Sequence, residues 1–241
     1  LLRKRYTRSH SELGSPAFLR QWYFVLRHGR VGHCQDFTLK IIIIIYYLFI
    51  INIMKYRLIA EIGGNHKGEI EIASKMIEIA ATKCNADIIK FQKRTNRLLL
   101  SNEEYNQPHP VPENSYGSSY GEHREFLEFD LDQHKFLKKK CEKFNKIYSS
   151  SVWDLNSAKE IISLNPEIIK IPSSQNLNFE LLEYICNIFS NEIHISLGMT
   201  KKSEIDKIFK ETLKYSKNMN VVFYHCTSDY PADYSDLNLL E

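Results

Sequence analysis

The sequence predicts an α/β fold in which short apolar strands alternate with amphipathic helices. Two observations carry this prediction: a strand, turn, helix and strand within residues 58–92, and repetition of the same alternation along the rest of the chain. A third observation, polar side chains at successive strand ends, favours a barrel whose mouth is formed by those ends. We therefore expect a fold of (β/α)8 TIM-barrel type, of which only about the first six βα units are present.

Length and composition limit the class of protein. A chain of 241 residues suits one α/β domain, or one domain with an attached tail. The formal net charge of +3 gives no bulk electrostatic argument for binding nucleic acid. The five cysteines are odd in number and form no C-x-x-C pair, so we interpret them as reduced thiols of a cytoplasmic protein.

Residues 1–53 do not follow the alternating pattern. They contain an apolar run, residues 41–51, that is shorter than the roughly 20 residues a membrane-spanning helix needs. Met54 stands directly before the organised region. We therefore interpret residues 1–53 as an untranslated or artefactual extension and residues 54–241 as a partial barrel domain. A short membrane anchor in the apolar run is the alternative.

The first unit joins two expected strands, residues 58–62 and 88–91, through a glycine-rich turn and a helix. Each strand is apolar except for one charged residue, Glu61 in the first and Lys90 in the second. A charge in a buried strand is costly unless a partner compensates it. The helix between the strands has apolar side chains at helical spacing, namely Ile70, Ala73, Met76, Ile77 and Ala80.

The later units follow a long polar segment, residues 93–130, whose prolines, glycines and tyrosines predict a loop. Further strands are expected at residues 146–151, 167–173, 192–198 and 220–228. Helices are expected at residues 131–145, 157–164, 179–189 and 201–215. In the first of these helices, we expect the inward side chains to be Phe136, Leu137 and Phe144.

Six units in one orientation are compatible with a doubly wound sheet or with a barrel cut short. The sequence contains neither G-x-G-x-x-G nor G-x-x-x-x-G-K-[ST], so nucleotide-binding open sheets lose support. The barrel is favoured by the polar residues at strand ends, which are Glu61, Lys90, Gln92, Ser151, Lys170, Ser173 and Ser228.

Two lysines with several hydroxyls suit a small, multiply charged anion such as phosphoenolpyruvate or a sugar phosphate. Taken singly, each lysine could instead reach solvent, and each serine could cap a helix.

Seven motifs follow one another in order and spacing from residue 54 onward: AEIGGNHKG, IIKFQKR, YGEHREFLEF, SSSVWD, IIKIPSS, SLGM and HCTSDYP. Together they resemble the sialic acid synthase family, which includes N-acetylneuraminate synthases and the pseudaminic and legionaminic acid synthases. Residues 1–53 match nothing in that family.

This resemblance implies an enzyme that condenses phosphoenolpyruvate with an N-acylmannosamine-type aldose, such as N-acetylmannosamine or its 6-phosphate. C3 of the enol would attack the open-chain aldehyde, water would add at C2, and phosphate would leave by C–O cleavage, giving a nonulosonic acid. By motif, the ligands of phosphoenolpyruvate would be Lys90, Ser151, Lys170, Ser173 and Ser228. Glu61 would lie at the reacting centre, and the residues facing the sugar would be Gln92, Gln175 and Tyr230. Family members often carry Glu at the position of Gln175, Asn at that of Ser228 and Thr at that of Leu197. These differences leave the identity of the sugar substrate undetermined.

The resemblance also implies a divalent metal, Mn²⁺ or Mg²⁺, that polarises the aldehyde or orients the water. The family's two histidine ligands belong to S-x-H and E-R-H motifs that would follow Glu241, so we expect no metal ligand in this chain. The antifreeze-like domain of the homodimeric full-length members is expected beyond the same point. We expect His66 and His123 to form hydrogen bonds in their loops or with the sugar, and His225 and Cys226 to lie in the core.

Six strands do not close an eight-stranded barrel, so we expect exposed edges on the first and sixth strands and self-association of the chain. Three alternative functions stay open at this point. They are a non-catalytic anion-binding remnant, a membrane-tethered protein, and a related phosphoenolpyruvate aldol synthase that makes a shorter 3-deoxy ulosonate.

Overall fold

The structure, a computed structural model, describes residues 57–216, 219–229 and 231–237. All of them belong to the second of the two units into which the chain divides, Arg57–Glu241. The apolar run at residues 41–51, the expected start at Met54 and the predicted sugar ligand Tyr230 lie outside the described residues. The proposed division after residue 53 therefore stays a prediction.

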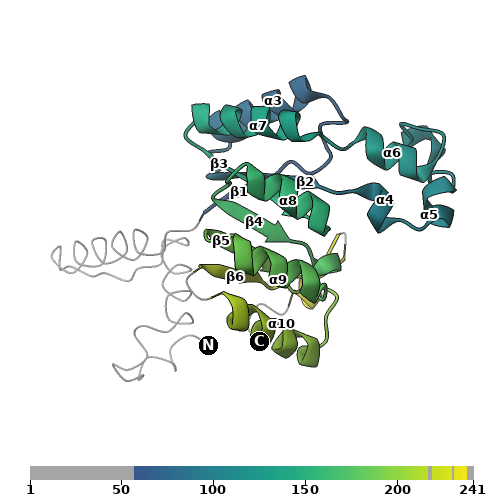
Figure 1. Cartoon of the computed structure of the whole chain (residues 1–241). Coiled ribbons are helices and arrows are strands. Elements are labelled where there is room, and N and C mark those ends of the chain that lie inside the picture. Colours follow the sequence, from purple (N-terminus) through teal and green to yellow (C-terminus); the bar gives the residue numbers. More distant parts are fainter. Residues whose placement is uncertain (1–56, 217–218, 230, 238–241) are drawn as a thin grey trace, which may run out of the picture. The chain divides into compact units, whose positions relative to one another are not determined.

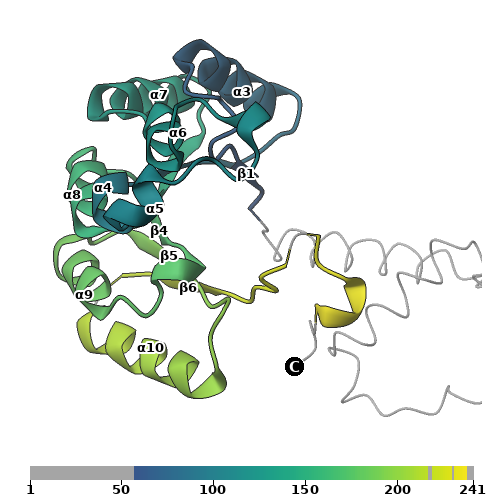
Figure 2. The ribbon, with the colours of Figure 1, turned by 90° about the vertical axis from the view of Figure 1, so that its right-hand side faces the viewer.

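The described chain contains a six-stranded sheet in which every neighbouring pair is parallel. The strands are β1 (Ile59–Glu61), β2 (Ile88–Lys93), β3 (Ile147–Val152), β4 (Ile168–Ile171), β5 (Glu192–Ser196) and β6 (Val221–Tyr224). Their order in the sheet is their order in the sequence, whereas a doubly wound sheet reverses direction at a switch point. In Figure 2 the helices form an arc around one side of the curled sheet. The predicted α/β fold of partial TIM-barrel type is confirmed.

One long helix covers the outer side of each successive βα unit (Figure 1). These helices are α3 (Ile70–Thr82), α7 (Leu131–Lys143), α8 (Leu155–Ser163), α9 (Phe179–Ile188) and α10 (Lys202–Tyr215). Helix α8 begins two residues before the expected start because Asp154 caps it, accepting a 2.8 Å hydrogen bond from the Ser157 amide.

The segment predicted as a loop at residues 93–130 contains three short helices, so that prediction was wrong in part. They are α4 (Asn96–Leu99), α5 (Asn102–Asn106) and α6 (Tyr120–Phe126), with a 3-10 turn, η2, at Pro112–Asn114. Ser101 and Glu104 form a reciprocal capping box that starts α5, and Ser119 caps α6. Local capping therefore stabilises helices that are too short to show an apolar period.

Four of the strands end earlier than expected. Strands β1 and β5 stop at Glu61 and Ser196 rather than at residues 62 and 198. The strand predicted to reach residue 173 stops at Ile171, since Pro172 lacks an amide hydrogen and leads into a 3-10 turn, η3 (Ser173–Gln175). The last strand stops at Tyr224 rather than at residue 228. The polar residues after these strands consequently lie on loops at the carboxyl ends of the strands.

The outer face of the sheet packs on the helices through two apolar clusters. One joins β1–β3 to α3 and α7, and the other joins β3–β6 to α8, α9 and α10. The expected inward residues of α3 lie in the first cluster, with Ala73 and Ile77 fully buried. Phe136 was wrongly assigned to the core, because it is 48% exposed while its neighbour Leu137 is fully buried. Adjacent helical residues point about 100° apart, so the two cannot share one face.

The four described cysteines, Cys84, Cys141, Cys186 and Cys226, are free thiols, as expected. Among the described residues, no helix combines the length and the apolar character needed to cross a membrane.

Candidate anion-binding site

Alternation along the strands separates an apolar outer face from a polar inner face. On β2, Ile89 and Phe91 enter the outer core, so Lys90 and Gln92 point to the opposite side of the sheet. The register then aligns the inner-face residues across strands: Glu61 pairs with Lys90, Gln92 with Ser151, and Ser151 with Lys170. The polar residues selected from the sequence on β1–β4 therefore share one face and occupy neighbouring positions.

Lys90 is the centre of this group. Its side chain is 6% exposed, its Nζ donates to Ser151 Oγ at 3.0 Å, and it forms an ion pair with Glu61 on the adjacent strand. Burial lowers the pKa of Lys90; the Glu61 carboxylate opposes this shift, and the positive charge of Lys170 adds to it. The buried charge has its partner, as expected from the cost of burying an ion.

A second group of hydroxyls gathers around Gly198, just after β5. A Cβ added to Gly198 would lie 2.3 Å from Ser228 Oγ and 2.8 Å from Ser173 Oγ, so both hydroxyls point at this glycine. Asn176, which is buried, holds the same turn through hydrogen bonds from Nδ2 to the carbonyl oxygens of Ser196 at 2.9 Å and Gly198 at 3.1 Å. The structure thus brings Ser173 and Ser228 together, although they belong to different βα units.

The predicted sugar ligands Gln92 and Gln175 do not lie together in one group, unlike the serines and lysines described above. Gln92 lies beside the β1 loop, where a Cβ at Gly64 would be 3.5 Å from its Nε2. The side-chain oxygen of Gln175 accepts a 3.1 Å hydrogen bond from Asn178, the residue that caps α9. No contact described in the structure links Gln175 to Lys90 or to Ser151.

The loop histidines behave as expected. His66 is buried, accepts a 3.1 Å hydrogen bond at Nδ1 from the Gly68 amide, and stacks on Phe129 with ring centroids 4.0 Å apart. Burial lowers the pKa of His66 to about 4. His123 accepts a 3.2 Å hydrogen bond at Nδ1 from the Tyr116 amide. Both side chains organise the loops around them.

His225 does not lie in the core, so that expectation was wrong. It is exposed, and its Nε2 donates to the carbonyl oxygen of Leu237 at 2.9 Å. The physical reason is that β6 ends one residue earlier, at Tyr224. Cys226 is half-buried rather than fully buried.

Within residues 57–216, 219–229 and 231–237, no three His, Cys, Asp or Glu side chains gather closely enough to hold a metal ion. The described residues therefore form no three-ligand metal site by themselves.

Sequence reasoning missed the inner-face residues of β5 and β6. Glu192 and His194 share a face with Lys170, because Lys170 is the register partner of His194. Tyr224 on β6 joins them through a 2.7 Å hydrogen bond to His194. The signal was present, since polar residues on β5 alternate with Ile193 and Ile195, both fully buried in the outer cluster.

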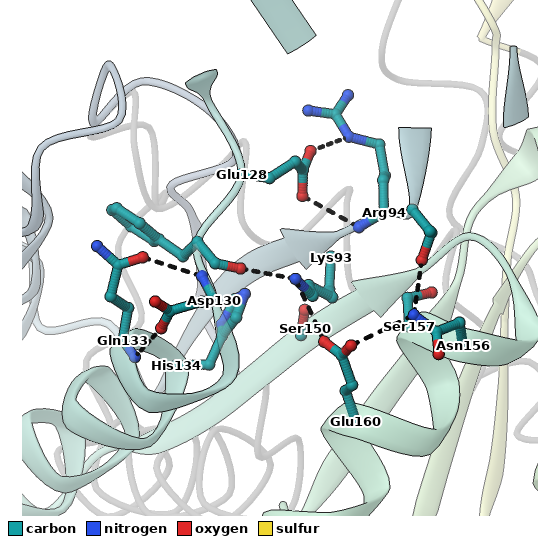
Figure 3. A network of polar contacts seen from close by, with 12 residues as sticks. Lys93, Arg94, Glu128, Asp130, Gln133, His134, Ser150, Asn156, Ser157 and Glu160 are labelled. Atoms are coloured by element: carbon teal, nitrogen blue, oxygen red, sulfur yellow. Dashed lines mark hydrogen bonds and ion pairs between the residues drawn. The ribbon is translucent and has the colours of Figure 1, made fainter. Parts of the chain in front are cut away.

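A polar network on the other side of β2 fastens the segment before α7 to the barrel (Figure 3). Lys93 Nζ donates to the Phe129 carbonyl oxygen at 2.7 Å and forms an ion pair with Glu160 at 3.3 Å. Arg94 forms a buried ion pair with Glu128, and the Arg94 amide donates to the same carboxylate at 3.0 Å. Residues 94–128, which follow the carboxyl end of β2, are thereby held at both of their ends.

Comparison with known proteins identifies relatives of this barrel. The chain is 34% identical over 182 residues to N-acetylneuraminate-9-phosphate synthase of Drosophila melanogaster. This alignment covers 76% of this chain and 48% of the relative. It is 33% identical over 186 residues to N,N'-diacetyllegionaminic acid synthase of Campylobacter jejuni, covering 77% and 55%. The chain thus spans about half the length of the curated relatives it matches.

Solved structures give the same result. The crystal structure of an N-acetylneuraminic acid synthetase from Leptospira borgpetersenii serovar Hardjo-bovis, in complex with citrate, superposes with a TM-score of 0.62 at 25% identity. The match covers 76% of this chain and 57% of that one. Residues 76–241, well over half of the sequence, match the NeuB family. The fold, the motifs and this match agree, and the chain belongs to the NeuB family.

Proposed function

We propose that this chain carries the phosphoenolpyruvate-binding face of an N-acetylneuraminate synthase-like enzyme. The reaction condenses phosphoenolpyruvate with N-acetylmannosamine, its 6-phosphate or a related 2-acetamido aldose to form a nonulosonic acid and phosphate. The observation that carries the proposal is the Lys90–Ser151 hydrogen bond on the inner face, with Lys170 in the next register position. Two ammonium groups beside hydroxyl donors are suited to an anion that bears both a carboxylate and a phosphate.

The side chains of this chain would chiefly align and neutralise the substrate. Lys90 and Lys170 would balance its charge, and Ser151, Ser173 and Ser228 would donate hydrogen bonds to its oxygens. Glu61, already paired with Lys90, would lie at the reacting carbon atoms as an acid, a base or an electrostatic stabiliser. Bringing two substrates into line and stabilising developing charge account for large rate effects in such condensations.

The bonds formed and broken balance without a redox partner. A new C–C bond forms between C3 of the enol and the aldehyde carbon, and the aldehyde oxygen takes up a proton. Water supplies the oxygen added at C2, and the C2–O bond to phosphate breaks. The sugar would be faced by Gln92, Gln175 and Tyr230.

The relatives support this assignment by their names, which are those of N-acetylneuraminate-9-phosphate and diacetyllegionaminic acid synthases. The Leptospira synthetase binds citrate, a small anion with several charges. A homodimeric assembly and a cytoplasmic location are further parts of the proposal, as is a divalent metal held by residues other than those the structure describes. All three derive from the family resemblance.

The test is phosphate release by the full chain with phosphoenolpyruvate, Mn²⁺ and one of three aldoses: N-acetylmannosamine, its 6-phosphate or a pentose 5-phosphate. Release with either amino sugar supports the proposal, and the preferred sugar identifies the branch. Release with the pentose phosphate alone would favour a synthase of shorter ulosonates. Binding of phosphoenolpyruvate without release from any aldose would support the binding face but not the condensation, as expected of an anion-binding remnant. Absence of binding would contradict both the synthase and the remnant.

A further inference from the structure

A chain of three hydrogen-bonded side chains, Glu192, His194 and Tyr224, runs along the inner face of β5 and β6. Tyr224 Oη lies 2.7 Å from His194 Nδ1, and His194 Nε2 lies 2.5 Å from Glu192 Oε1. Arg57 forms an ion pair with the same carboxylate oxygen. Glu192 is the first residue of β5 and Tyr224 is the last residue of β6. This series of hydrogen bonds therefore extends from the amino ends of the strands to their carboxyl ends.

The direction of each hydrogen bond follows from the charge states. His194 is 1% exposed, and burial lowers its pKa although Glu192 acts in the opposite sense, so the imidazole is neutral at pH 7. Burial raises the pKa of Tyr224, which keeps the phenol protonated. The hydrogen-bond network then assigns the tautomer: Nε2–H donates to Glu192, and Nδ1 accepts from the Tyr224 hydroxyl. The hydroxyl end of Tyr224 is thereby tethered to β5.

The ring of Tyr224 lies next to Lys170. Lys170 Nζ is 5.4 Å from the centre of that ring, a distance at which the face of an aromatic ring attracts an ammonium group. Lys170 is also the register partner of both Ser151 and His194. The long side chain of Lys170 would otherwise sample many rotamers. The positive charge of Lys90 also repels the Lys170 ammonium. The tethered ring gives the Lys170 ammonium one favoured position.

We propose that Tyr224, held by His194 and Glu192, is a positioning residue that fixes the Lys170 ammonium for the substrate anion. This inference rests on the proposed function, since it takes Lys170 as a ligand of phosphoenolpyruvate. Loss of the ring would leave Lys170 charged but mobile. The consequence is weaker binding of the anion without removal of any group that touches it.

The test is calorimetric titration of the full chain with phosphoenolpyruvate, comparing Lys170→Met, Tyr224→Leu and Tyr224→Phe. The matched control is Phe223→Leu. Phe223 precedes Tyr224 on β6 but packs on Phe209 in the outer cluster, with ring centroids 4.1 Å apart. The control therefore removes a ring from the same strand without reaching Lys170.

We expect Tyr224→Leu to raise the dissociation constant about tenfold, the size of a partly desolvated cation–π contact. Tyr224→Phe keeps the ring and loses only the tether, so its effect should be about threefold. Phe223→Leu should lower the melting temperature yet leave the dissociation constant unchanged. If Tyr224→Leu does not fold, Tyr224→Phe still provides the comparison with the unsubstituted chain.

The outcomes separate the two claims. A loss of binding in Lys170→Met with none in either Tyr224 variant would overturn the positioning role and leave the proposed function intact. Equal losses in Phe223→Leu and Tyr224→Leu would likewise overturn it, because they would reflect stability alone. Unchanged binding in Lys170→Met would overturn the positioning role together with the proposed role of Lys170.

Discussion

Lys90 and Glu61 form an ion pair whose two members differ sharply in exposure. The Lys90 side chain is 6% exposed, whereas that of Glu61 is 55% exposed. The cation is therefore desolvated, while its counter-ion reaches water. Because a buried charge without a partner is costly, we expect Glu61 to leave Lys90 only when a second anion takes its place.

Lys90→Met should weaken binding of phosphoenolpyruvate by about 10- to 100-fold, because it removes one charge-assisted hydrogen bond. The methionine keeps much of the aliphatic volume in the buried position. Calorimetric titration measures the change. Lys75→Met is the matched control, since Lys75 is an exposed lysine on α3 paired with Glu78. Equal affinities for the two variants would contradict the assignment of Lys90.

Gly198→Ala should weaken anion binding at least several-fold while changing the melting temperature little. The added Cβ would meet the hydroxyls of Ser173 and Ser228, which rotate away easily but then no longer point at the turn, and it would lie 3.1 Å from the Cβ of Cys226. Titration with phosphoenolpyruvate and a thermal melt of the same sample give the two quantities. The variant Gly64→Ala is the comparison, because its Cβ has an ordinary 3.5 Å contact with Gln92. A large loss of stability with unchanged affinity would contradict this account.

Acid should destabilise the fold as the pH falls from about 6.5 toward 4. His66 and His134 are buried, and burial lowers their pKa values to about 4 and about 3. In this window the two histidines are protonated in the unfolded chain but stay neutral in the folded chain. Each histidine therefore lowers the free energy of unfolding by about 1.4 kcal/mol for each unit by which the pH falls. Urea unfolding at pH 7.5, 6.0 and 5.0 measures the slope.

Two variants test the source of that slope. His134→Leu combined with Tyr148→Phe removes one buried histidine and the hydroxyl hydrogen-bonded to its Nδ1 at 2.7 Å, so the slope should become shallower. His225→Gln alters an exposed histidine and should leave the slope as it is. A free energy of unfolding that does not change between pH 7.5 and 5.0 would rule out this effect.

The sequence predicted which polar residues share the inner face where one strand and its neighbour determine this. Lys90 and Gln92 were placed on one face because side chains alternate with a period of two, and their neighbours Glu61 and Ser151 follow from parallel register. The Tyr224–His194 contact escaped prediction because it joins two strands diagonally, at a distance that no local pattern encodes. His225 was misplaced for a related reason, since an apolar run does not reveal the residue at which pairing stops.

Glu128→Gln should destabilise the fold by about 3–5 kcal/mol, the cost of leaving a buried charge without its partner. Arg94 and Glu128 are each 10% exposed, and burial raises the pKa of Glu128 while Arg94 opposes that shift. Glutamine keeps the shape of the side chain but not its charge, so the Arg94 guanidinium would remain buried and uncompensated. Urea unfolding measures the loss.

Replacing both members of this pair distinguishes charge from packing. Arg94→Met with Glu128→Met removes both charges and keeps apolar volume, so it should recover most of the stability lost in Glu128→Gln. The exposed pair of Lys75 and Glu78 gives the matched comparison, and Glu78→Gln should leave the unfolding midpoint unchanged. If the double variant were as unstable as Glu128→Gln, the loss would come from packing or from the Arg94 amide, which donates to the Glu128 carboxylate. The ion pair would then have no special part in joining the two ends of residues 94–128.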